Sequence, residues 1–436
     1  MNGHRILLIA HNVLDPGTNM GKTLSGFFRG YASEHLAELY FHSEVPTMAL
    51  CRRYYRITDV DAFQSVSPWF RGNIGQAFSE KDIDPSRLSP RTDTGILEKM
   101  YAIGSRRKPW TYAARNRIRQ LSDRHCQGLY RWISEFSPDV IFFAAGDYAF
   151  AYDIAYRISR DFEIPIVMYC CDDYFLNPRN PGSLLGRRVH KGLMQSVRRC
   201  VSRTNAILTV CDQMTCAYQA LFDLPIHTVY TGYRCKNQPD GPGNGIVYLG
   251  NLGEGRYHSL VEIGRALKRI SERTGESLHL DVYSGERRPD ILRKLTQKNG
   301  IVFHGAVDAD AVSRILAQSR LVVHTESFDQ TCRRHVMYSV STKLADLLAS
   351  GRCIFAYGPS EVASMEYLLQ NRAACVVHAE DRLEAELEEI WHNPERRNRI
   401  IASAACLSEK NHNPENLRQE LWKIINQSCR PGTPDG

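Results

Sequence analysis

The chain has 436 residues, of which 43% are apolar and 24% are charged, and its formal net charge is +7. This length favours two domains of about 200 residues each, and the composition excludes a disordered or fibrous protein. The longest apolar runs are far shorter than the ~20 residues of a membrane-spanning helix. The start, MNGHRILLIA, lacks the features of a signal peptide, so we expect a cytoplasmic protein.

The 13 cysteines are scattered along the chain rather than arranged as a disulfide framework. Their number is odd, and Cys170 and Cys171 are adjacent rather than spaced as CxxC. No Cys or His group has the spacing of zinc ligands. We therefore expect reduced thiols and no bound metal.

Short apolar runs alternate with amphipathic stretches along the whole chain, which predicts parallel sheets with crossover helices and an α/β fold. In the first half the expected strands are Arg5–Ala10, Leu39–Phe41, Val140–Ala144, Ile166–Tyr169, Ala206–Val210 and His227–Tyr230. Residues 45–135 show no convincing strand, so we expect inserted helices and loops there. Together these elements define an N-terminal domain over residues 1–233.

The Pro-, Gly- and Asn-rich segment within residues 234–245 is typical of an interdomain linker. After it the expected strands are Ile246–Leu249, His279–Ser284, Ile301–His304, Leu321–His324, Cys353–Ala356 and Ala374–Val377. They define a second domain over residues 246–415, followed at 416–436 by a closing helix, Asn416–Gln427, and a tail. Two Rossmann-like, doubly wound domains facing across a cleft would bring the carboxyl ends of both sheets to one ligand site.

The most specific motif runs from Ser341 to Gly358. Ser341 is suited to cap a helix, Asp346 lies within that helix, and Gly351 ends it before a strand. Asp346-Leu-Leu-Ala-Ser-Gly351 resembles the Glu-Ala-Met-Ala-Ser-Gly that closes the E-x7-E pattern of GT-B glycosyltransferases, particularly the retaining family often called GT4. The resemblance implies that Asp346 holds the ribose of a nucleotide.

By the same resemblance, Ser341 and Thr342 hold the diphosphate at the helix N-terminus. Lys343 either adds a positive charge there or is an ordinary surface lysine. A cation in the first turn opposes the helix dipole unless an anion is bound, which favours the first interpretation.

The motif departs from the family pattern at its first glutamate, where this chain has Tyr338. The nearest acid is Glu326, which precedes an apparent insertion. Glu326 either takes the catalytic position near the transferred sugar or is a solvated loop residue.

A second region, Gly245 to Arg256, resembles the family's strand and Gly-Arg-Leu turn, where two cations bracket the diphosphate. Here Gly250 is followed by Asn251 at the arginine position, and Arg256 stands at the lysine position. Further along, Ser284 and Gly305 each end a strand in small residues. The resemblance places Gly305 near the nucleobase, although both segments also suit plain turns.

Near the N-terminus, the loop that contains Gly17 and Gly21 follows the first strand, as does the loop of GT-B acceptor domains that faces the donor phosphates. Gly21-Lys22-Thr23 is also similar to the end of a phosphate-binding P-loop. That motif is one residue short, because Pro16 stands where the cradle needs an N–H. We therefore reject an ATPase.

Three polar residues follow strands of the N-terminal domain, namely His11, Asp147 and Asp172, the last next to Asp173. Each is a candidate for acid–base catalysis or acceptor binding. His11 is equally compatible with a core position, and Asp172 or Asp173 with a helix cap. Retaining GT-B enzymes rely on front-face attack assisted by the leaving phosphate, so a dedicated base is not required.

Basic residues gather with aromatics in residues 106–131, and a second basic group lies in residues 187–203. This pattern suits the anionic inner face of a membrane, with a lipid-linked acceptor, but also suits solvated helix faces. No nucleic-acid motif accompanies it.

The resemblance implies transfer of a sugar from a nucleotide-diphosphate donor to a hydroxyl acceptor, with retention and without metal or cofactor. Cell-surface polysaccharide or glycolipid assembly is the expected role. A GT-B isomerase, a phosphorylase and an inactive nucleotide-sugar-binding protein remain open.

Overall fold

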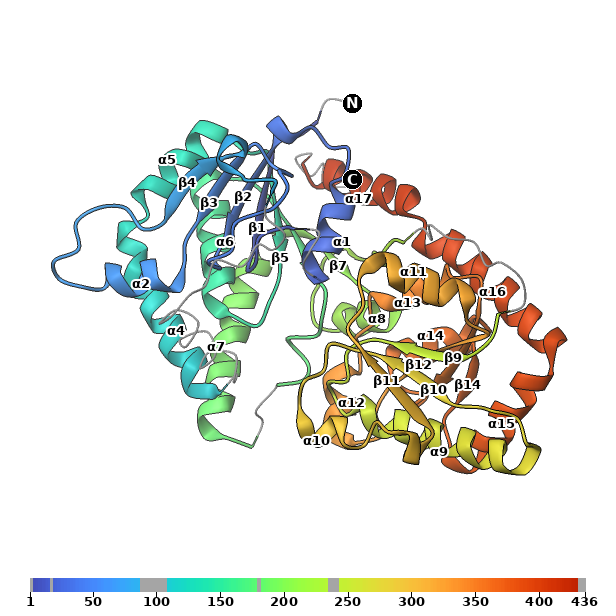
Figure 1. Cartoon of the computed structure of the whole chain (residues 1–436). Coiled ribbons are helices and arrows are strands. Elements are labelled where there is room, and N and C mark those ends of the chain that lie inside the picture. The colour runs from blue at the N-terminus through green and yellow to red at the C-terminus, as the bar shows by residue number, and fades with distance from the viewer. Residues whose placement is uncertain (1–2, 16–18, 87–107, 179–181, 234–242, 430–436) are drawn as a thin grey trace. The chain divides into compact units, whose positions relative to one another are not determined.

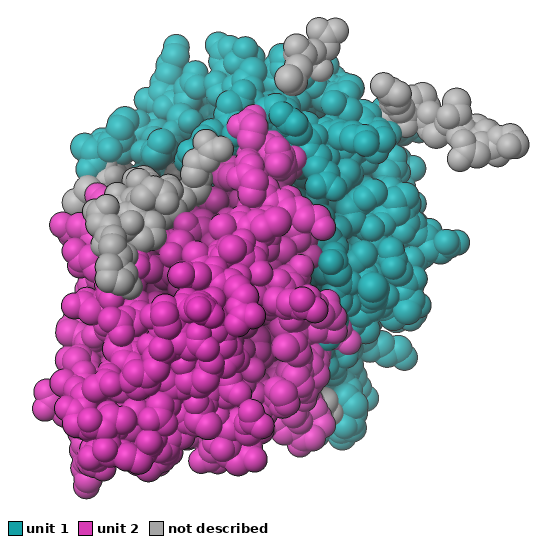
Figure 2. Space-filling model, turned by 90° about the vertical axis from the view of Figure 1, so that its right-hand side faces the viewer, with its two compact units in different colours: residues 1–229, 418–436 teal, residues 230–417 magenta. Residues whose placement is uncertain are grey.

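The computed structural model describes residues 3–15, 19–86, 108–178, 182–233 and 243–429. Its contacts divide the chain into unit 1, residues 1–229 and 418–436, and unit 2, residues 230–417 (Figure 2). The predictions for Gly17, for linker residues 234–242 and for the tail, residues 430–436, concern residues outside those described. The expected closing helix is α17 (Pro414–Ser428), most of which belongs to unit 1.

Unit 1 contains an eight-stranded sheet in the order β4-β3-β2-β1-β5-β6-β7-β8 (Figure 1). The strands are β1 (Ile6–Ala10), β2 (Leu36–Tyr40), β3 (Arg53–Arg56), β4 (Gln76–Ser79), β5 (Val140–Ala144), β6 (Ile166–Cys170), β7 (Thr204–Thr209) and β8 (Ile226–Thr228). All neighbours are parallel except β3 and β4. The central strands are apolar and buried along their whole length, as expected of a parallel sheet covered on both faces.

Helices connect these strands. They are α1 (Asn19–Phe27), α2 (Asp59–Ser65), α4 (Pro109–Ser122), α5 (Gln127–Phe136), α6 (Ala149–Phe162), α7 (Leu184–Val201) and α8 (Asp212–Gln219). Strand order runs outward in both directions from the β1–β5 pair. Because parallel crossovers are right-handed, α1 and α6 cover opposite faces, and unit 1 is doubly wound.

The prediction that residues 45–135 contain no strand is wrong, because β3 and β4 lie there. The β3 sequence, RYYR, has charged ends and buries only its two tyrosine rings. The edge strand β4 is partly exposed. Neither strand forms the continuous apolar run by which the other strands were identified.

Unit 2 contains a six-stranded, fully parallel sheet in the order β11-β10-β9-β12-β13-β14. The strands are β9 (Ile246–Leu249), β10 (Leu280–Tyr283), β11 (Ile301–Gly305), β12 (Leu321–Thr325), β13 (Cys353–Tyr357) and β14 (Cys375–Val377). Order reverses at the β9–β12 pair, so this sheet is also doubly wound. Every strand predicted from the sequence is present, with small shifts at the ends.

The helices of unit 2 are α9 (Arg256–Thr274), α10 (Pro289–Leu292), α11 (Ala309–Gln318), α12 (Gln330–Val336), α13 (Lys343–Leu348), α14 (Ala363–Gln370), α15 (Glu380–His392) and α16 (Pro394–His412). The core packs α9, α15 and α16 against the sheet through residues such as Leu260, Leu387 and Ile400. In the described parts of the chain, no helix is both long and apolar enough to cross a membrane.

Candidate functional site

A cavity of about 600 Å³ lies at the carboxyl ends of β9, β10 and β11 in unit 2. Ligands of open parallel sheets bind at this edge, beside the point where strand order reverses. The cavity is lined by Leu249, Gly250, Asn251, Leu252, Tyr283, Ser284, Gly285, Glu286, Arg288, Ala306, Val307, Val312, Leu316, Lys343, Asp346 and Leu347. Five of the residues predicted from the sequence therefore share one cavity: Gly250, Asn251, Ser284, Lys343 and Asp346.

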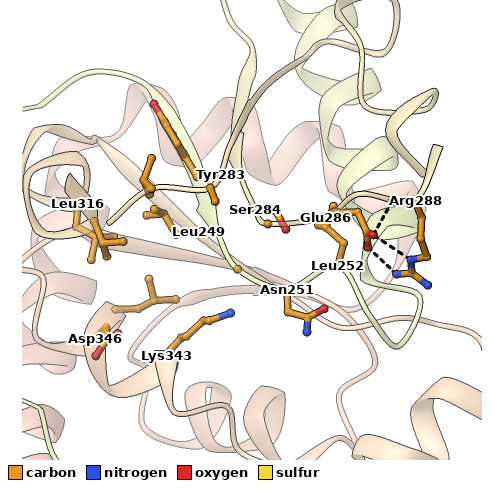
Figure 3. Close-up of a pocket in the computed structure, with 16 residues that line it drawn as sticks. Leu249, Asn251, Leu252, Tyr283, Ser284, Glu286, Arg288, Leu316, Lys343 and Asp346 are labelled. Carbon is orange, nitrogen blue, oxygen red and sulfur yellow. Dashed lines mark hydrogen bonds and ion pairs between the residues drawn. The ribbon is translucent and has the colours of Figure 1, made fainter. Parts of the chain in front are cut away.

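The two ends of the cavity differ in chemistry (Figure 3). Leu249 and Leu316 lie at one end, on the same side as Asp346. Ser284, Glu286 and Arg288 lie at the other end, where the Arg288 guanidinium donates to the Glu286 carboxylate at 2.6 and 3.0 Å. These hydrogen bonds lower the pKa of Glu286 to about 2. The cavity thus joins an apolar compartment to a polar one.

Lys343 is the first residue of α13, and its ammonium group extends toward Asn251 (Figure 3). A Cβ at position 250 would lie 2.8 Å from the Tyr248 hydroxyl and 3.1 Å from the Lys343 Nζ. Glycine at 250 therefore leaves room for both groups. Burial, and next the nearby Arg256 cation, lower the pKa of Lys343, while the Asp346 carboxylate raises it.

The prediction that Ser341 is the N-cap of this helix is wrong by one residue. The N-cap is Thr342, which makes no side-chain cap, while the Ser341 Oγ accepts a long, 3.4 Å hydrogen bond from the Lys343 N–H. The Leu344 N–H is bound to the Ser341 carbonyl. Ser341 and Thr342 do not line the cavity, and their role with a diphosphate stays a prediction.

Glu326 follows β12 and is paired with Arg256, the first residue of α9. The Arg256 Nε donates to Oε2 of Glu326 at 2.9 Å, and Nη2 donates to Oε1 at 3.1 Å. Glu326 is 1% exposed, so the alternative that it is a solvated loop acid is wrong. The pair connects the segments that follow β9 and β12, the two strands at which strand order reverses. Arg256 is not among the residues that line the cavity.

Other buried polar groups surround this pair. The Ser259 hydroxyl donates to the Glu326 carbonyl at 2.8 Å. The His324 Nε2 lies 3.0 Å from the Ser364 hydroxyl and 3.8 Å from Oε1 of Glu326. Burial lowers the pKa of His324 to about 3, so its imidazole is neutral and Arg256 is the cation that balances Glu326.

Three residues that line the cavity were not predicted as site residues: Tyr283, Glu286 and Arg288. All three lie at the carboxyl end of β10 or directly after it, which is the positional signal that would have found them. Ser284 was identified there, and its N–H donates to the Gly305 carbonyl at 2.8 Å. Gly305 has a φ of +78°, which favours glycine, and the two residues that follow it line the cavity.

In unit 1, His11 follows β1 and meets Tyr148, which follows the neighbouring strand β5. The two rings are stacked with centroids 5.0 Å apart, and the Arg115 guanidinium lies 4.1 Å from the Tyr148 centroid. Burial, and next Arg115, hold the pKa of His11 well below its usual value. Its Nδ1 is buried and has no hydrogen-bond partner among the described residues. His11 is therefore neutral.

Asp147 and Asp173 line a small cavity of about 50 Å³ between α4 and α7. Asp147 accepts from the Tyr112 hydroxyl at 2.7 Å. Asp173 accepts from the N–H groups of residues 175–177, so it is the aspartate that caps the following turn. Its neighbour Asp172 accepts from the Asp173 N–H at 3.1 Å. Gly21 is buried in α1.

Two arginines of the expected membrane surface are internal instead. Arg115 and Arg119 both bind Asp59, at 2.9 and 2.7 Å, and Arg119 is 2% exposed. Burial alone would raise the pKa of Asp59, but these two cations lower it to about 2. These ion pairs hold α4 on α2, so the two guanidinium groups are bound within unit 1 rather than presented on its surface. Arg106 and Arg107 lie outside the described residues.

Within the described residues, no group of three or more His, Cys, Asp or Glu side chains is arranged to hold a metal ion. The described cysteines are free thiols, most of them buried.

The family described as "Glycosyl transferase-like" matches residues 264–423. No curated protein matches the chain significantly. Solved structures match over nearly the full chain. One is HepE from Anabaena in complex with UDP and glucose, with 12% identity, a TM-score of 0.60, and coverage of 97% of this chain and 100% of that one.

Two further solved structures are similar. The α,α-trehalose 6-phosphate synthase from Burkholderia multivorans has 11% identity and a TM-score of 0.60, with 99% of this chain and 100% of that one covered. WaaG, a glycosyltransferase involved in lipopolysaccharide biosynthesis, has 10% identity and a TM-score of 0.55, with 96% and 99% covered. At these identities the likeness shows the fold. The resemblance to GT-B glycosyltransferases is thereby confirmed, through two Rossmann-like units and a family match in the second.

Proposed function

We propose that this protein is a glycosyltransferase that moves a sugar from a nucleotide-diphosphate donor to a hydroxyl acceptor. The observation that carries the proposal is the 600 Å³ cavity of unit 2, where Asp346 and Lys343 meet an apolar compartment at the carboxyl edge of a parallel sheet. Most of this cavity lies in the region that matches the glycosyltransferase-like family.

Each part of a nucleotide sugar has a matching part of the cavity. The apolar end, with Leu249 and Leu316, suits a nucleobase, and Asp346 on the same side suits the two ribose hydroxyls. Lys343, one helical turn before Asp346, suits the diphosphate. Because HepE was solved with UDP and glucose, a uridine nucleotide is the first donor to test.

The chemistry needs positive charge where the diphosphate departs. Lys343 lines the cavity and Arg256 lies close enough to lower its pKa, so two cations would stabilise the developing charge without a metal or other cofactor. Arg256 is held by Glu326, so a bound diphosphate must compete with that carboxylate. In our proposal Glu326 then lies near the transferred sugar, and attack occurs on the front face with retention.

The acceptor would use unit 1, with His11, Asp147 and Asp172 at the carboxyl ends of β1, β5 and β6. A neutral His11 accepts or donates a hydrogen bond without carrying charge, which suits a sugar hydroxyl. The fold of WaaG, which is involved in lipopolysaccharide biosynthesis, supports a role in cell-surface polysaccharide or glycolipid assembly on the cytoplasmic side of a membrane.

One observation favours a second candidate, a protein that binds nucleotide sugars without transferring them. Arg256 is neutralised by Glu326, and Asn251 lines the cavity where the family has an arginine. The cavity would then bind the donor, but with too little positive charge to release the diphosphate.

Slow hydrolysis of the donor, with water as the acceptor, tests the proposal without knowledge of the natural acceptor. We expect UDP, GDP or ADP to be released from one nucleotide sugar, in the presence of a chelator, and the sugar first seen by proton NMR to keep the donor's anomeric configuration. Binding of a nucleotide sugar with no turnover would favour the second candidate. Inverted sugar would exclude retention.

A further inference from the structure

The helices α4 and α7 of unit 1 begin side by side. Their first turns line the same small cavity, through Pro109 and Tyr112 of α4 and through Gly186, Val189 and His190 of α7. The helices also pack against each other, as seen in Figure 1. Side chains that point outward from these two helix starts therefore belong to one surface.

This surface is positively charged. Neither helix contains an acidic residue. Lys108 is the N-cap of α4, and Arg187, Arg188 and Lys191 occupy the first two turns of α7, all of them exposed. The partial positive charge of both helix N-termini adds to these cations, and the nearby acidic side chains, Asp147 and Asp173, line the small cavity. The arrangement therefore favours an anionic partner.

The same surface exposes large apolar side chains. Trp110 is 53% exposed, Leu184 is 73% exposed and Leu185 is 40% exposed. Each is the first or second residue of its helix, so all three lie among the cations. Exposed tryptophan and leucine within a cationic surface are typical of protein that rests in the headgroup region of a bilayer.

We propose that this α4–α7 surface, formed by Lys108, Trp110, Leu184, Leu185, Arg187, Arg188 and Lys191, docks on an anionic lipid bilayer. The functional consequence of docking rests on the proposed function. If the acceptor hydroxyl is carried by a membrane-held molecule, docking brings unit 1 to its substrate. The surface differs from the sequence prediction, because Arg115 and Arg119 are excluded from it and the leucines are added.

The apolar residues distinguish a bilayer from a nucleic acid. A phosphate backbone would satisfy the cations and a base would stack on Trp110, but neither would bury Leu184 and Leu185. An acyl-chain boundary accepts all three side chains, while the cations remain at the level of the lipid phosphates.

The test is sedimentation of the full chain with vesicles of phosphatidylcholine, with or without phosphatidylglycerol. We expect binding only when phosphatidylglycerol is present, and weaker binding as salt is raised. Each surface cation contributes about fivefold to such binding. The variant R188E/K191E should therefore bind roughly 30-fold more weakly or worse.

The matched control is K298E/K423E, which makes the same change in charge at two exposed lysines outside the surface. It should retain vesicle binding. The variant W110S/L184S keeps every charge and should also lose binding, because it removes the apolar contacts. Titration with UDP should give the same affinity in all these variants, which shows that unit 2 remains folded.

Failure of the wild-type protein to bind phosphatidylglycerol vesicles would overturn the proposal. An equal loss of vesicle binding in R188E/K191E and K298E/K423E would also overturn it. Tighter binding to single-stranded RNA than to vesicles would also overturn it and indicate a nucleic-acid surface. Failure of UDP to bind the wild type, with vesicle binding intact, would instead contradict the donor site. The two failures are therefore distinguishable.

Discussion

The two sheets share the order of six parallel strands but differ in the side chains at the point where strand order reverses. In unit 2 this point carries a buried ion pair, Arg256 with Glu326, beside Lys343 and a large cavity. In unit 1 it carries a neutral His11 stacked on Tyr148, and the nearby Arg115 is bound to Asp59. A doubly wound sheet fixes where a ligand binds, while the side chains at its edge decide which ligand. The comparison suggests an anionic ligand for unit 2 and an uncharged one for unit 1.

The largest effect is expected when the ion pair of unit 2 is broken. Arg256→Met would leave the Glu326 carboxylate buried without its cation, which typically costs about 3–5 kcal/mol of the free energy of unfolding. Denaturant unfolding of the variant measures this cost. The double variant R256M/E326Q should recover most of the loss. A single variant as stable as the wild type would show that the pair is not a structural element of the site.

A smaller effect is expected from the cation that lines the cavity. Lys343→Met should weaken UDP binding by about 1.5–3 kcal/mol, the usual contribution of a hydrogen bond to a charged group. Its stability should not fall, because the pKa of Lys343 is lowered by burial and the charge is therefore unfavourable in the empty site. Calorimetric titration and thermal unfolding of the same sample measure both quantities. An unchanged affinity for UDP would show that Lys343 is not part of the nucleotide site.

The smallest effect concerns the neutral histidine of unit 1. The pKa of His11 is held below its usual value by burial and by Arg115. As the pH falls below about 6.5 the unfolded chain takes up a proton that the folded unit does not, so stability decreases. His11→Gln should remove up to about 1.4 kcal/mol per pH unit from this slope. Unfolding of both proteins between pH 7 and about pH 5 measures it, and an identical slope would mean that His11 is protonated in the fold.

The sequence predicted the strands well because buried parallel strands are continuous apolar runs, as in Val140–Ala144. It missed β3 because Tyr54 and Tyr55 bury their rings between charged neighbours, and that pattern carries no clear period. The shared location of Asp346 and Lys343 was also predictable, because the two residues are close in sequence and lie on one short helix.

What could not be predicted depends on contacts between distant segments. Glu326 and Arg256 are 70 residues apart, and their individual motifs did not indicate that they are paired. Likewise, Arg119 is 60 residues from Asp59, so a count of basic residues placed it on a surface although it is buried. The partner of a charged residue, and therefore its burial, cannot be predicted from the sequence when the two residues lie in distant segments.

The most direct test of the donor site is calorimetric titration with UDP, GDP and ADP, in the presence of a chelator, of the wild type and Asp346→Ala. We expect one nucleoside diphosphate to bind the wild type without metal. We expect the variant to bind it at least about tenfold more weakly, because the ribose loses its carboxylate partner. Equal affinity in the two proteins, or no diphosphate binding at all, would contradict the assignment of the unit 2 cavity as a nucleotide-sugar site.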